Sequence, residues 1–226
     1  MEDINLEIDT HSYEPLRIQV YKTLREAIIN GGIKPGKKIS ELEIADKLNV
    51  SRTPVREAFH MLELEDLIII IPQKGVFVAG IKSKKEINDI FLVRMELEGL
   101  AAALAAKNIS QNQIEKLNNY INQIKKCIQE DDLKKCIQID ISFHNIIKEA
   151  SDNKWLEKNL DNLFEQITRF RAKSLGKKGR MEEALTEHKK LGIAISEGNS
   201  ELAQKLAREH IQGAWDSVIS VFEDDD

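Results

Sequence analysis

The stretch ISELEIADKLNVSRTPVREAFHMLELEDLIIIIPQKGVFVAG (residues 39–80) decides the fold of the first third of this chain. Ser40 and Glu43 have the spacing of a capping box, in which each side chain satisfies the backbone N–H of the other residue, so a short helix begins here. Ser51 precedes a second helix and is expected to cap its first turn. Pro54 falls in that turn, where its missing N–H costs no hydrogen bond. Two short helices this close together predict a helix-turn-helix.

The residues on either side of this helix pair complete a small domain. Upstream, apolar residues three to four positions apart over residues 16–28 predict another helix, which ends at a Gly-Gly pair. Downstream, the apolar runs 67–71 and 76–78 flank a Pro-Gln-Lys-Gly turn, a pattern typical of a two-stranded hairpin. Three helices followed by a hairpin predict a winged helix-turn-helix over residues 15–80.

The rest of the chain is predicted to be helical throughout. Capping-box patterns begin at Ser83 and Ser110, and no further strand pattern follows them. The predicted helices cover residues 84–107, 111–130, 132–150, 153–175, 180–197 and 200–222. We therefore expect a mainly α protein, with an N-terminal winged helix-turn-helix followed by an antiparallel all-helical bundle of about six helices. The expected domains are a flexible leader (1–14), the winged helix (15–80) and the helical domain (81–226).

Composition and charge exclude several classes of protein. The N-terminus lacks the apolar core of a signal peptide, and the longest near-apolar stretch, residues 97–106, is too short to span a bilayer. Two cysteines, Cys127 and Cys136, are too few for a disulfide framework, so we expect a cytoplasmic protein in which both are small buried hydrophobes. Residues 1–80 hold 10 basic and 13 acidic side chains. This balance does not exclude DNA, but it makes dimerisation and specific contacts more necessary.

The start of the second helix of a helix-turn-helix faces base edges in the major groove. Arg52 and Arg56 are four residues apart and share one helix face, which suits hydrogen bonds to guanine or phosphate. The alternative is that both are solvated surface charges, with Arg56 paired to Glu57 or Asp46. The candidate DNA-contacting residues lie at the start of this helix and at the hairpin tip: Ser51, Arg52, Thr53, Arg56, Lys74 and Gly75.

Three histidines and one aspartate lie on apolar helix faces in the second half of the chain. Asp140 and His144 are four residues apart and project from one face, while His188 and His210 each lie on the apolar stripe of another helix. A buried carboxylate needs compensation, and three imidazoles with one carboxylate form a suitable ligand set for a divalent transition metal, zinc or nickel. The alternatives are hydrogen-bonded core histidines, or a metal-free site in which the histidines bind an anion.

Arginines near this set are candidates for binding an anionic effector. Arg94 lies on the apolar stripe of its helix, from where its guanidinium group can clamp a carboxylate through two hydrogen bonds. Its alternative role is an ion pair with Glu98, four residues later. Arg169 and Arg171 are weaker candidates in a helix otherwise rich in apolar residues.

The segment VSRTPVREAF (50–59), followed by an apolar strand and a glycine at the wing tip, resembles the winged helix of the GntR family of bacterial transcription regulators. The resemblance implies that the recognition-helix residues and the wing tip named above contact operator DNA. The family often has an arginine where this chain has Leu42, which puts one usual DNA contact in doubt.

Four short motifs in the second half resemble the ligand-sensing FCD domain of the FadR subfamily: Arg94-x-x-Leu97-Glu98, Asp140-x-x-x-His144, Glu187-His188 and His210. In family members with this set, the aspartate and the three histidines bind a metal whose coordination a small carboxylate completes. The resemblance implies a homodimer on a pseudo-palindromic double-stranded operator, a small organic acid effector and no membrane partner. Repression relieved by the effector is the commoner arrangement. The alternative function is a metal-dependent enzyme that activates water at this site.

Overall fold

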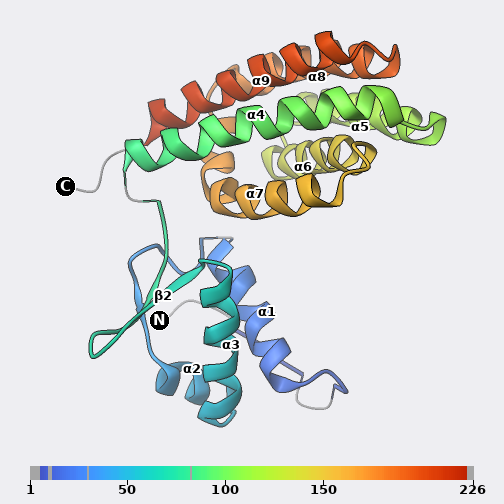
Figure 1. Cartoon of the computed structure of the whole chain (residues 1–226). Helices are drawn as coiled ribbons and strands as arrows, with labels where there is room; N and C mark the ends of the chain where they lie inside the picture. The colour runs from blue at the N-terminus through green and yellow to red at the C-terminus, as the bar shows by residue number, and fades with distance from the viewer. Residues whose placement is uncertain (1–5, 10–11, 30, 82, 223–226) are drawn as a thin grey trace. The chain divides into compact units, whose positions relative to one another are not determined.

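The computed structural model describes residues 6–9, 12–29, 31–81 and 83–222, apart from the side chains of 165–169, 172 and 173. The chain divides into two compact units, Met1–Ile81 and Lys82–Asp226, and each is described by itself (Figure 1). The first unit combines helices with a small antiparallel sheet, and the second is helical, as the sequence predicts.

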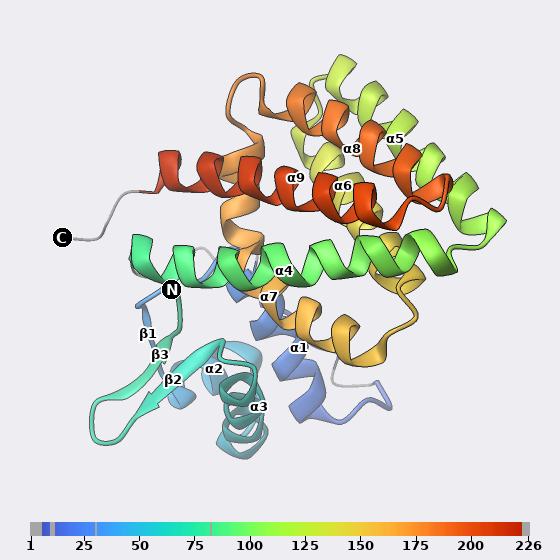
Figure 2. The same ribbon diagram turned by 45° about the horizontal axis from the view of Figure 1, so that its top comes forward.

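The elements of the N-terminal unit are α1 (Leu16–Ile29), β1 (Lys38–Ile39), α2 (Glu41–Leu48), α3 (Arg52–Leu64), β2 (Ile68–Ile71) and β3 (Gly75–Val78). The predicted winged helix-turn-helix is therefore confirmed, with one addition to the predicted hairpin. Lys38 and Ile39 pair antiparallel with Phe77 and Val76, so the sheet has three strands in the order β1-β3-β2 (Figure 2). A strand of two residues is too short to show the alternation by which a strand is predicted.

The turn between α2 and α3 follows from one residue in the left-handed region. Asn49 ends α2 with a φ of 52°, a conformation that asparagine tolerates better than most residues. Ser51 precedes α3 in an extended conformation, but its side chain makes no capping hydrogen bond within the described residues, in contrast to the prediction. Ser40 does cap α2, through the N–H of Leu42 at 3.3 Å. Two caps predicted from the same residue type thus differ in geometry.

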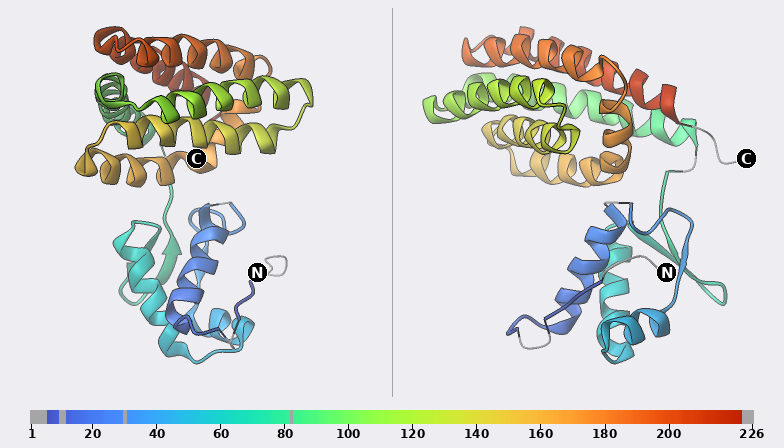
Figure 3. Two further views of the ribbon diagram at one scale, coloured as in Figure 1. Left: turned by 90° about the vertical axis from the view of Figure 1, so that its right-hand side faces the viewer. Right: turned by 180° about the vertical axis from the view of Figure 1, so that it is seen from behind.

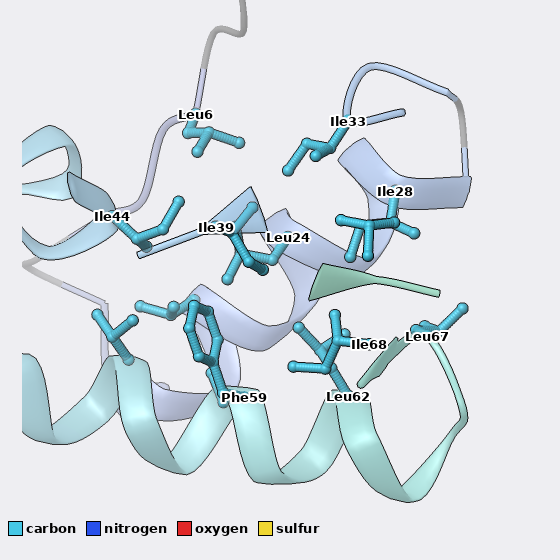
Figure 4. Close-up of a cluster of buried hydrophobic side chains, with 14 of the residues drawn as sticks. Leu6, Leu24, Ile28, Ile33, Ile39, Ile44, Phe59, Leu62, Leu67 and Ile68 are labelled. Atoms are coloured by element: carbon cyan, nitrogen blue, oxygen red, sulfur yellow. The ribbon is translucent and has the colours of Figure 1, made fainter. Parts of the chain in front are cut away.

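The core of the N-terminal unit consists mainly of aliphatic side chains around one aromatic ring. Figure 4 shows Leu24 of α1, Ile39 of β1, Ile44 of α2 and Phe59 of α3 gathered in this core, where all four are almost fully buried. Every element of the unit therefore contributes to holding α3 in place, which leaves the outer face of α3 exposed.

Residues 6–9 pack against this core, although the sequence predicts a flexible leader over residues 1–14. Leu6 is 6% exposed, and the N–H of Asp9 donates to the side-chain oxygen of Gln19 on α1 at 2.9 Å. The prediction is therefore wrong for this segment, because its two apolar side chains, Leu6 and Ile8, do not follow a helical period. Residues 1–5, 10 and 11 lie outside the described residues.

The helices of the C-terminal unit are α4 (Lys84–Asn108), α5 (Gln111–Gln129), α6 (Leu133–Ala150), α7 (Lys154–Leu175), α8 (Arg180–Ser196) and α9 (Ser200–Val221). All six predicted helices are confirmed to within one residue at each end. Ser110 and Gln113 form the predicted capping box at the start of α5. In the described part of the chain, the helices lack the combination of length and apolar character that a bilayer span needs.

The six helices pack as antiparallel neighbours. Ser200, at the start of α9, donates to the backbone oxygen of Ala103 near the end of α4 at 2.9 Å. Trp215, towards the end of α9, donates to Asn88 near the start of α4 at 2.9 Å. These helices therefore run antiparallel side by side (Figures 1 and 2), and α5 and α6 form a neighbouring hairpin (Figure 3).

Cys127 in the last turn of α5 and Cys136 in the first turn of α6 form a disulfide, with their Cα atoms 5.5 Å apart. The sequence correctly predicts that both cysteines are buried, but the expectation of two unbonded side chains is wrong. The reason is the tight turn at residues 130–132, which brings the last turn of one helix beside the first turn of the next.

Candidate functional site: a recognition helix and a histidine chamber

The predicted recognition helix α3 exposes its two arginines and holds both on one carboxylate. The side chains of Arg52 and Arg56 are 60% and 58% exposed. Arg52 Nη2 lies 2.9 Å from Glu41 Oε2 of α2, and Arg56 Nε lies 3.0 Å from Glu41 Oε1. Of the partners considered from the sequence, Glu57 pairs instead with Arg17 at 3.7 Å. The two guanidinium groups are therefore held together by Glu41.

The charge of Glu41 is stabilised by this arrangement. The hydrogen bond from Arg56 lowers the pKa of Glu41 to about 2, and that from Arg52 adds to it, although partial burial opposes the shift. Glu41 is thus a carboxylate at neutral pH, and it keeps both cations at the N-terminal turn of α3. The sequence does not reveal this role, because Glu41 looks like an ordinary acidic residue in the first turn of α2.

The other candidate DNA-contacting residues are also accessible. Ser51 and Thr53 are exposed at the start of α3, and Lys74 is exposed at the tip of the β2–β3 hairpin. Gly75 adopts a φ of 116°, and a Cβ atom there would lie 2.7 Å from Lys38 Cε. The positive φ therefore favours glycine at the wing tip, and the side chain of Lys38 on β1 lies beside it. Leu42 is exposed on α2 and contributes no charge.

In the C-terminal unit, the three predicted histidines meet at one buried point, here called the histidine chamber: His144 of α6, His188 of α8 and His210 of α9. His210 Nε2 lies 3.4 Å from His188 Nε2 and 3.3 Å from His144 Nε2. Asp140 Oδ1 points to the same place, 3.8 Å from His144 Nε2 and 3.6 Å from His188 Nε2. The structure therefore brings together all four residues of the predicted ligand set.

Two carboxylates from other helices fix the orientation of two of these rings. Glu98 Oε2 of α4 lies 2.9 Å from His144 Nδ1, and Glu187 Oε2 of α8 lies 2.6 Å from His210 Nδ1. Because an ionised carboxylate only accepts, each hydrogen bond places the proton on Nδ1 and leaves the Nε2 lone pair directed into the chamber. Among the described atoms, His188 Nδ1 has no hydrogen-bond partner.

Burial lowers the pKa of two of these imidazoles, and hydrogen bonds hold the pKa of Glu187 low. Burial lowers the pKa of His188 well below 6.5, and the neighbouring histidines lower it further. Burial also lowers the pKa of His210, although Glu187 opposes this. For Glu187 itself, burial raises the pKa, but the hydrogen bonds from His210 and Arg180 outweigh burial and bring it to about 2. At neutral pH the neutral imidazoles of His188 and His210 therefore lie in the same buried region as the charged Glu187.

The donor set fits a divalent transition ion. Two ligand atoms that are each about 2.1 Å from a tetrahedral ion lie about 3.4 Å apart. The Nε2 separations of 3.3 and 3.4 Å match this value, and the distances to Asp140 Oδ1 are only slightly longer. When both rings carry their proton on Nδ1, the Nε2 lone pairs of His144 and His210 face each other at 3.3 Å, and a cation between them would make this contact attractive. The four residues would hold such an ion.

Three buried arginines surround the same chamber. Arg94 Nε hydrogen-bonds Glu98, so the predicted i,i+4 pair exists, and Arg94 also lines the chamber cavity. Arg171 Nη1 lies 3.1 Å from Asp140 Oδ2, which leaves Asp140 Oδ1 facing the imidazoles.

The third arginine is Arg180, which was not predicted from the sequence. It makes two hydrogen bonds of 2.9 Å to Glu187, and its Nε has no partner among the described atoms. Its position after the Gly-Lys-Lys-Gly loop suggests a surface residue rather than one that is 4% exposed. The side chain of Arg169 lies outside the described residues.

The chamber cavity is small. Its volume is about 30 Å³, and its polar lining includes Asp140, His144, His210 and the three arginines. That is room for about two waters. An organic acid therefore requires side chains to move, and the arginines are the groups with long, adjustable stems.

Comparisons with known proteins agree with both halves of this structure. Residues 16–78 match the model described as bacterial regulatory proteins of the gntR family, and residues 89–213 match the FCD domain model. The chain is 28% identical over 218 residues to the HTH-type transcriptional repressor RspR of Escherichia coli K12, covering 96% of this chain and 95% of that protein. It is 32% identical to the gluconate operon transcriptional repressor of Bacillus subtilis over 65% of this chain and 59% of that protein.

A solved structure supports the fold. E. coli McbR/YncC superposes with a TM-score of 0.77 at 21% identity, covering 93% of this chain and 100% of that one. The matching proteins are transcription regulators, which excludes the alternative of a metal-dependent enzyme. This chain belongs to the GntR family of bacterial transcription regulators and carries an FCD domain after its winged helix-turn-helix.

Proposed function

We propose that this regulator is a cytoplasmic repressor whose operator binding is controlled by a small carboxylate effector at a divalent metal in the histidine chamber. The observation that carries the proposal is the convergence of three imidazole Nε2 atoms and Asp140 Oδ1 on one buried point. Zinc and nickel both suit this set of ligands. The metal supplies a Lewis-acid site for the effector carboxylate when it is bound, and the repressor names of two relatives favour repression.

The charge balance of the chamber favours an effector with two negative charges. Its three carboxylates (Glu98, Asp140 and Glu187) offset its three arginines (Arg94, Arg171 and Arg180). An imidazole that binds a metal is neutral. A divalent ion then leaves a charge of 2+ in a buried site, which is costly unless it is compensated. A dicarboxylate restores neutrality. Arg94 is the residue that we assign to the second carboxylate, because its buried guanidinium group lines the cavity.

Metal analysis of protein purified without an affinity tag tests the metal assignment. We expect one transition ion per chain and a lower melting temperature after chelation, while His188→Ala purifies without the ion. If the wild-type protein contains no metal and a chelator leaves its melting temperature unchanged, the assignment is wrong. A thermal-shift comparison of dicarboxylates with monocarboxylates of equal length then tests the charge argument.

On the DNA side, we propose that a homodimer reads a pseudo-palindromic operator. The start of α3 (Ser51, Arg52, Thr53 and Arg56) would face base edges, and the wing tip (Lys74 and Gly75) would contact the minor groove or the phosphate backbone. The two half-sites of such an operator lie about one turn of the DNA double helix apart, so reading both requires two copies of the chain. On α4, Leu92, Val93 and Leu100 are large exposed hydrophobic residues available for such a contact.

An electrophoretic shift assay with DNA from upstream of the gene tests this assignment. The Arg52→Ala/Arg56→Ala variant should bind at least tenfold more weakly, because each arginine that reads a base contributes about 1–3 kcal/mol. Arg17→Ala, which removes an exposed arginine of α1, is the matched control and should bind like wild type. Equal binding by wild type and the double variant would refute the assignment. By linkage, an effector that releases DNA must bind the free dimer more tightly than the DNA-bound dimer.

A further inference from the structure

The disulfide lies at one end of the bundle, in contact with both hairpins that form that end. Cys127 and Cys136 are 0% and 2% exposed, and they belong to the same apolar cluster as Leu175 at the end of α7 and Met181 at the start of α8. The bond therefore fastens α5 to α6 at a place where the α7–α8 connection also packs.

Two short paths connect this disulfide to the histidine chamber. On α6, Cys136 is one turn before Asp140 and two turns before His144, so the three side chains project from the same side of the helix. On α8, Met181 in the disulfide cluster is next to Arg180, which lines the chamber cavity. A change at the sulfur atoms therefore reaches two chamber residues within one helical turn.

A second cavity lies against the disulfide, whose two cysteines are themselves almost fully buried. Its volume is about 230 Å³, compared with about 30 Å³ for the chamber cavity, and its lining includes both cysteines. Its lining also carries the basic residues Lys177 and Lys178 and the acidic residues Asp131, Asp132 and Glu182.

We infer that Cys127 and Cys136 are a reversible redox site, oxidised by small-molecule disulfides and reduced by small-molecule thiols that enter this second cavity. The disulfide form holds the start of α6 in place for metal binding in the chamber, and the dithiol form releases it. The redox reaction of the two cysteines does not depend on the proposed function, whereas its effect on the chamber rests on the proposed metal site. In bacteria with a reducing cytoplasm, an intracellular disulfide is usually of this responsive kind.

The chemistry balances with a disulfide RSSR as the oxidant. One cysteine thiolate attacks RSSR, a mixed disulfide forms and RS⁻ leaves. The second cysteine thiolate then attacks the mixed disulfide at the protein sulfur and displaces the second RS⁻. Two thiols are oxidised to one disulfide, RSSR is reduced to two RSH, and the two cysteine protons end on the released thiols.

The first experiment tests the redox site without reference to metal. The full-length protein is equilibrated in buffers of varied glutathione to glutathione-disulfide ratio, quenched with acid, alkylated in denaturant and analysed by mass spectrometry. We expect two thiols in reducing buffer, none in oxidising buffer, and a reversible transition between the two. The inference is overturned if glutathione never reduces the bond, and equally if glutathione disulfide never oxidises the two thiols.

The second experiment tests the link to the chamber with Co²⁺ as the probe. A thiolate ligand adds a sulfur charge-transfer band to Co²⁺, so binding at the cysteines is distinguished from binding at imidazoles and carboxylate. We expect the phosphine-reduced protein to bind Co²⁺ in the chamber about tenfold more weakly than the disulfide form, as is typical when the support around metal ligands is removed. The Cys127→Ser/Cys136→Ser variant should behave like the reduced protein in either buffer.

The two forms of the wild-type chain provide the comparison even if the double variant does not fold. Equal Co²⁺ affinity in the disulfide and dithiol forms would overturn the link. Absence of Co²⁺ binding in both forms, together with a redox titration that succeeds, would instead refute the proposed metal site. The two failures are therefore distinguishable.

Discussion

The two units of this protein use the same pair of groups, arginine and glutamate, in opposite environments. On α3, Arg52 and Arg56 both pair with Glu41, and these two arginine side chains are 60% and 58% exposed. In the histidine chamber, the side chains of Arg94 and Glu98 are 4% and 9% exposed. An exposed pair contributes little and is easily exchanged for another anion, whereas a buried pair is expensive to break. The first arrangement suits a surface that must release its counterion to bind DNA, and the second suits a site that must keep its shape.

The largest expected effect comes from breaking the buried pair. Arg94→Met leaves Glu98 charged in the chamber with one partner fewer, and we expect the free energy of unfolding to fall by about 3–5 kcal/mol. Arg52→Met at the exposed pair should change it by less than about 0.5 kcal/mol. Urea denaturation measures both variants. Similar losses from the two substitutions would show that burial does not distinguish the two sites, and Arg94→Met/Glu98→Gln should recover part of the loss.

The second-largest effect is expected from reduction of the disulfide, which should destabilise the C-terminal unit and leave the N-terminal unit unchanged. A loop of this length contributes about 2–3 kcal/mol through the entropy of the unfolded chain. Because both cysteines lie in the bundle, a phosphine should increase hydrogen exchange at the facing ends of α5 and α6 and leave α1–α3 unchanged. Mass spectrometry resolves the segments. Equal acceleration in both units, or none in the bundle, would contradict this prediction.

The carboxylates around the chamber should affect metal binding more than folding. Glu187→Gln weakens the hydrogen bond that orients His210, and we expect the Co²⁺ affinity to fall about tenfold. Glu183→Gln is the matched control, because Glu183 lies one turn earlier on α8 and also approaches Arg180, at 3.6 Å, but its side chain is 70% exposed. Isothermal titration compares the two variants. Equal loss in both would mean that Glu187 acts only through the general charge of the region.

The smallest effect is expected at Glu41, and it depends on pH. The folded-state pKa of about 2 is below the ordinary value of 4.5, so the ion pairs add stability above pH 4.5 that is lost as the pH falls towards 2. Wild type should exceed Glu41→Gln in unfolding free energy by less than about 1 kcal/mol at pH 6, since the pairs are near the surface. Denaturation from pH 6 to pH 3 should show the two stabilities converging. A constant difference over this range would exclude the titration of Glu41 as its cause.

Local patterns in the sequence account for the fold and for most of the candidate site. Helix periodicity and capping residues gave the six bundle helices to within one residue, because each helix carries its own pattern. The i,i+4 spacing of Asp140 and His144 also identified half of the chamber. The residues that were missed, Arg180 and Glu41, act through partners on distant turns or neighbouring helices. Strand β1 and the disulfide likewise depend on tertiary packing, which no local period encodes.

Glu41 also bears on how such a protein searches a genome. Where no guanine edge replaces it, its carboxylate stays between the two guanidinium groups and weakens their attraction to any phosphate nearby. Contact with an arbitrary sequence then displaces fewer counterions and is short-lived. On the proposed DNA-reading surface, such an acidic residue would reduce the time spent on the many competing sites that are not operators.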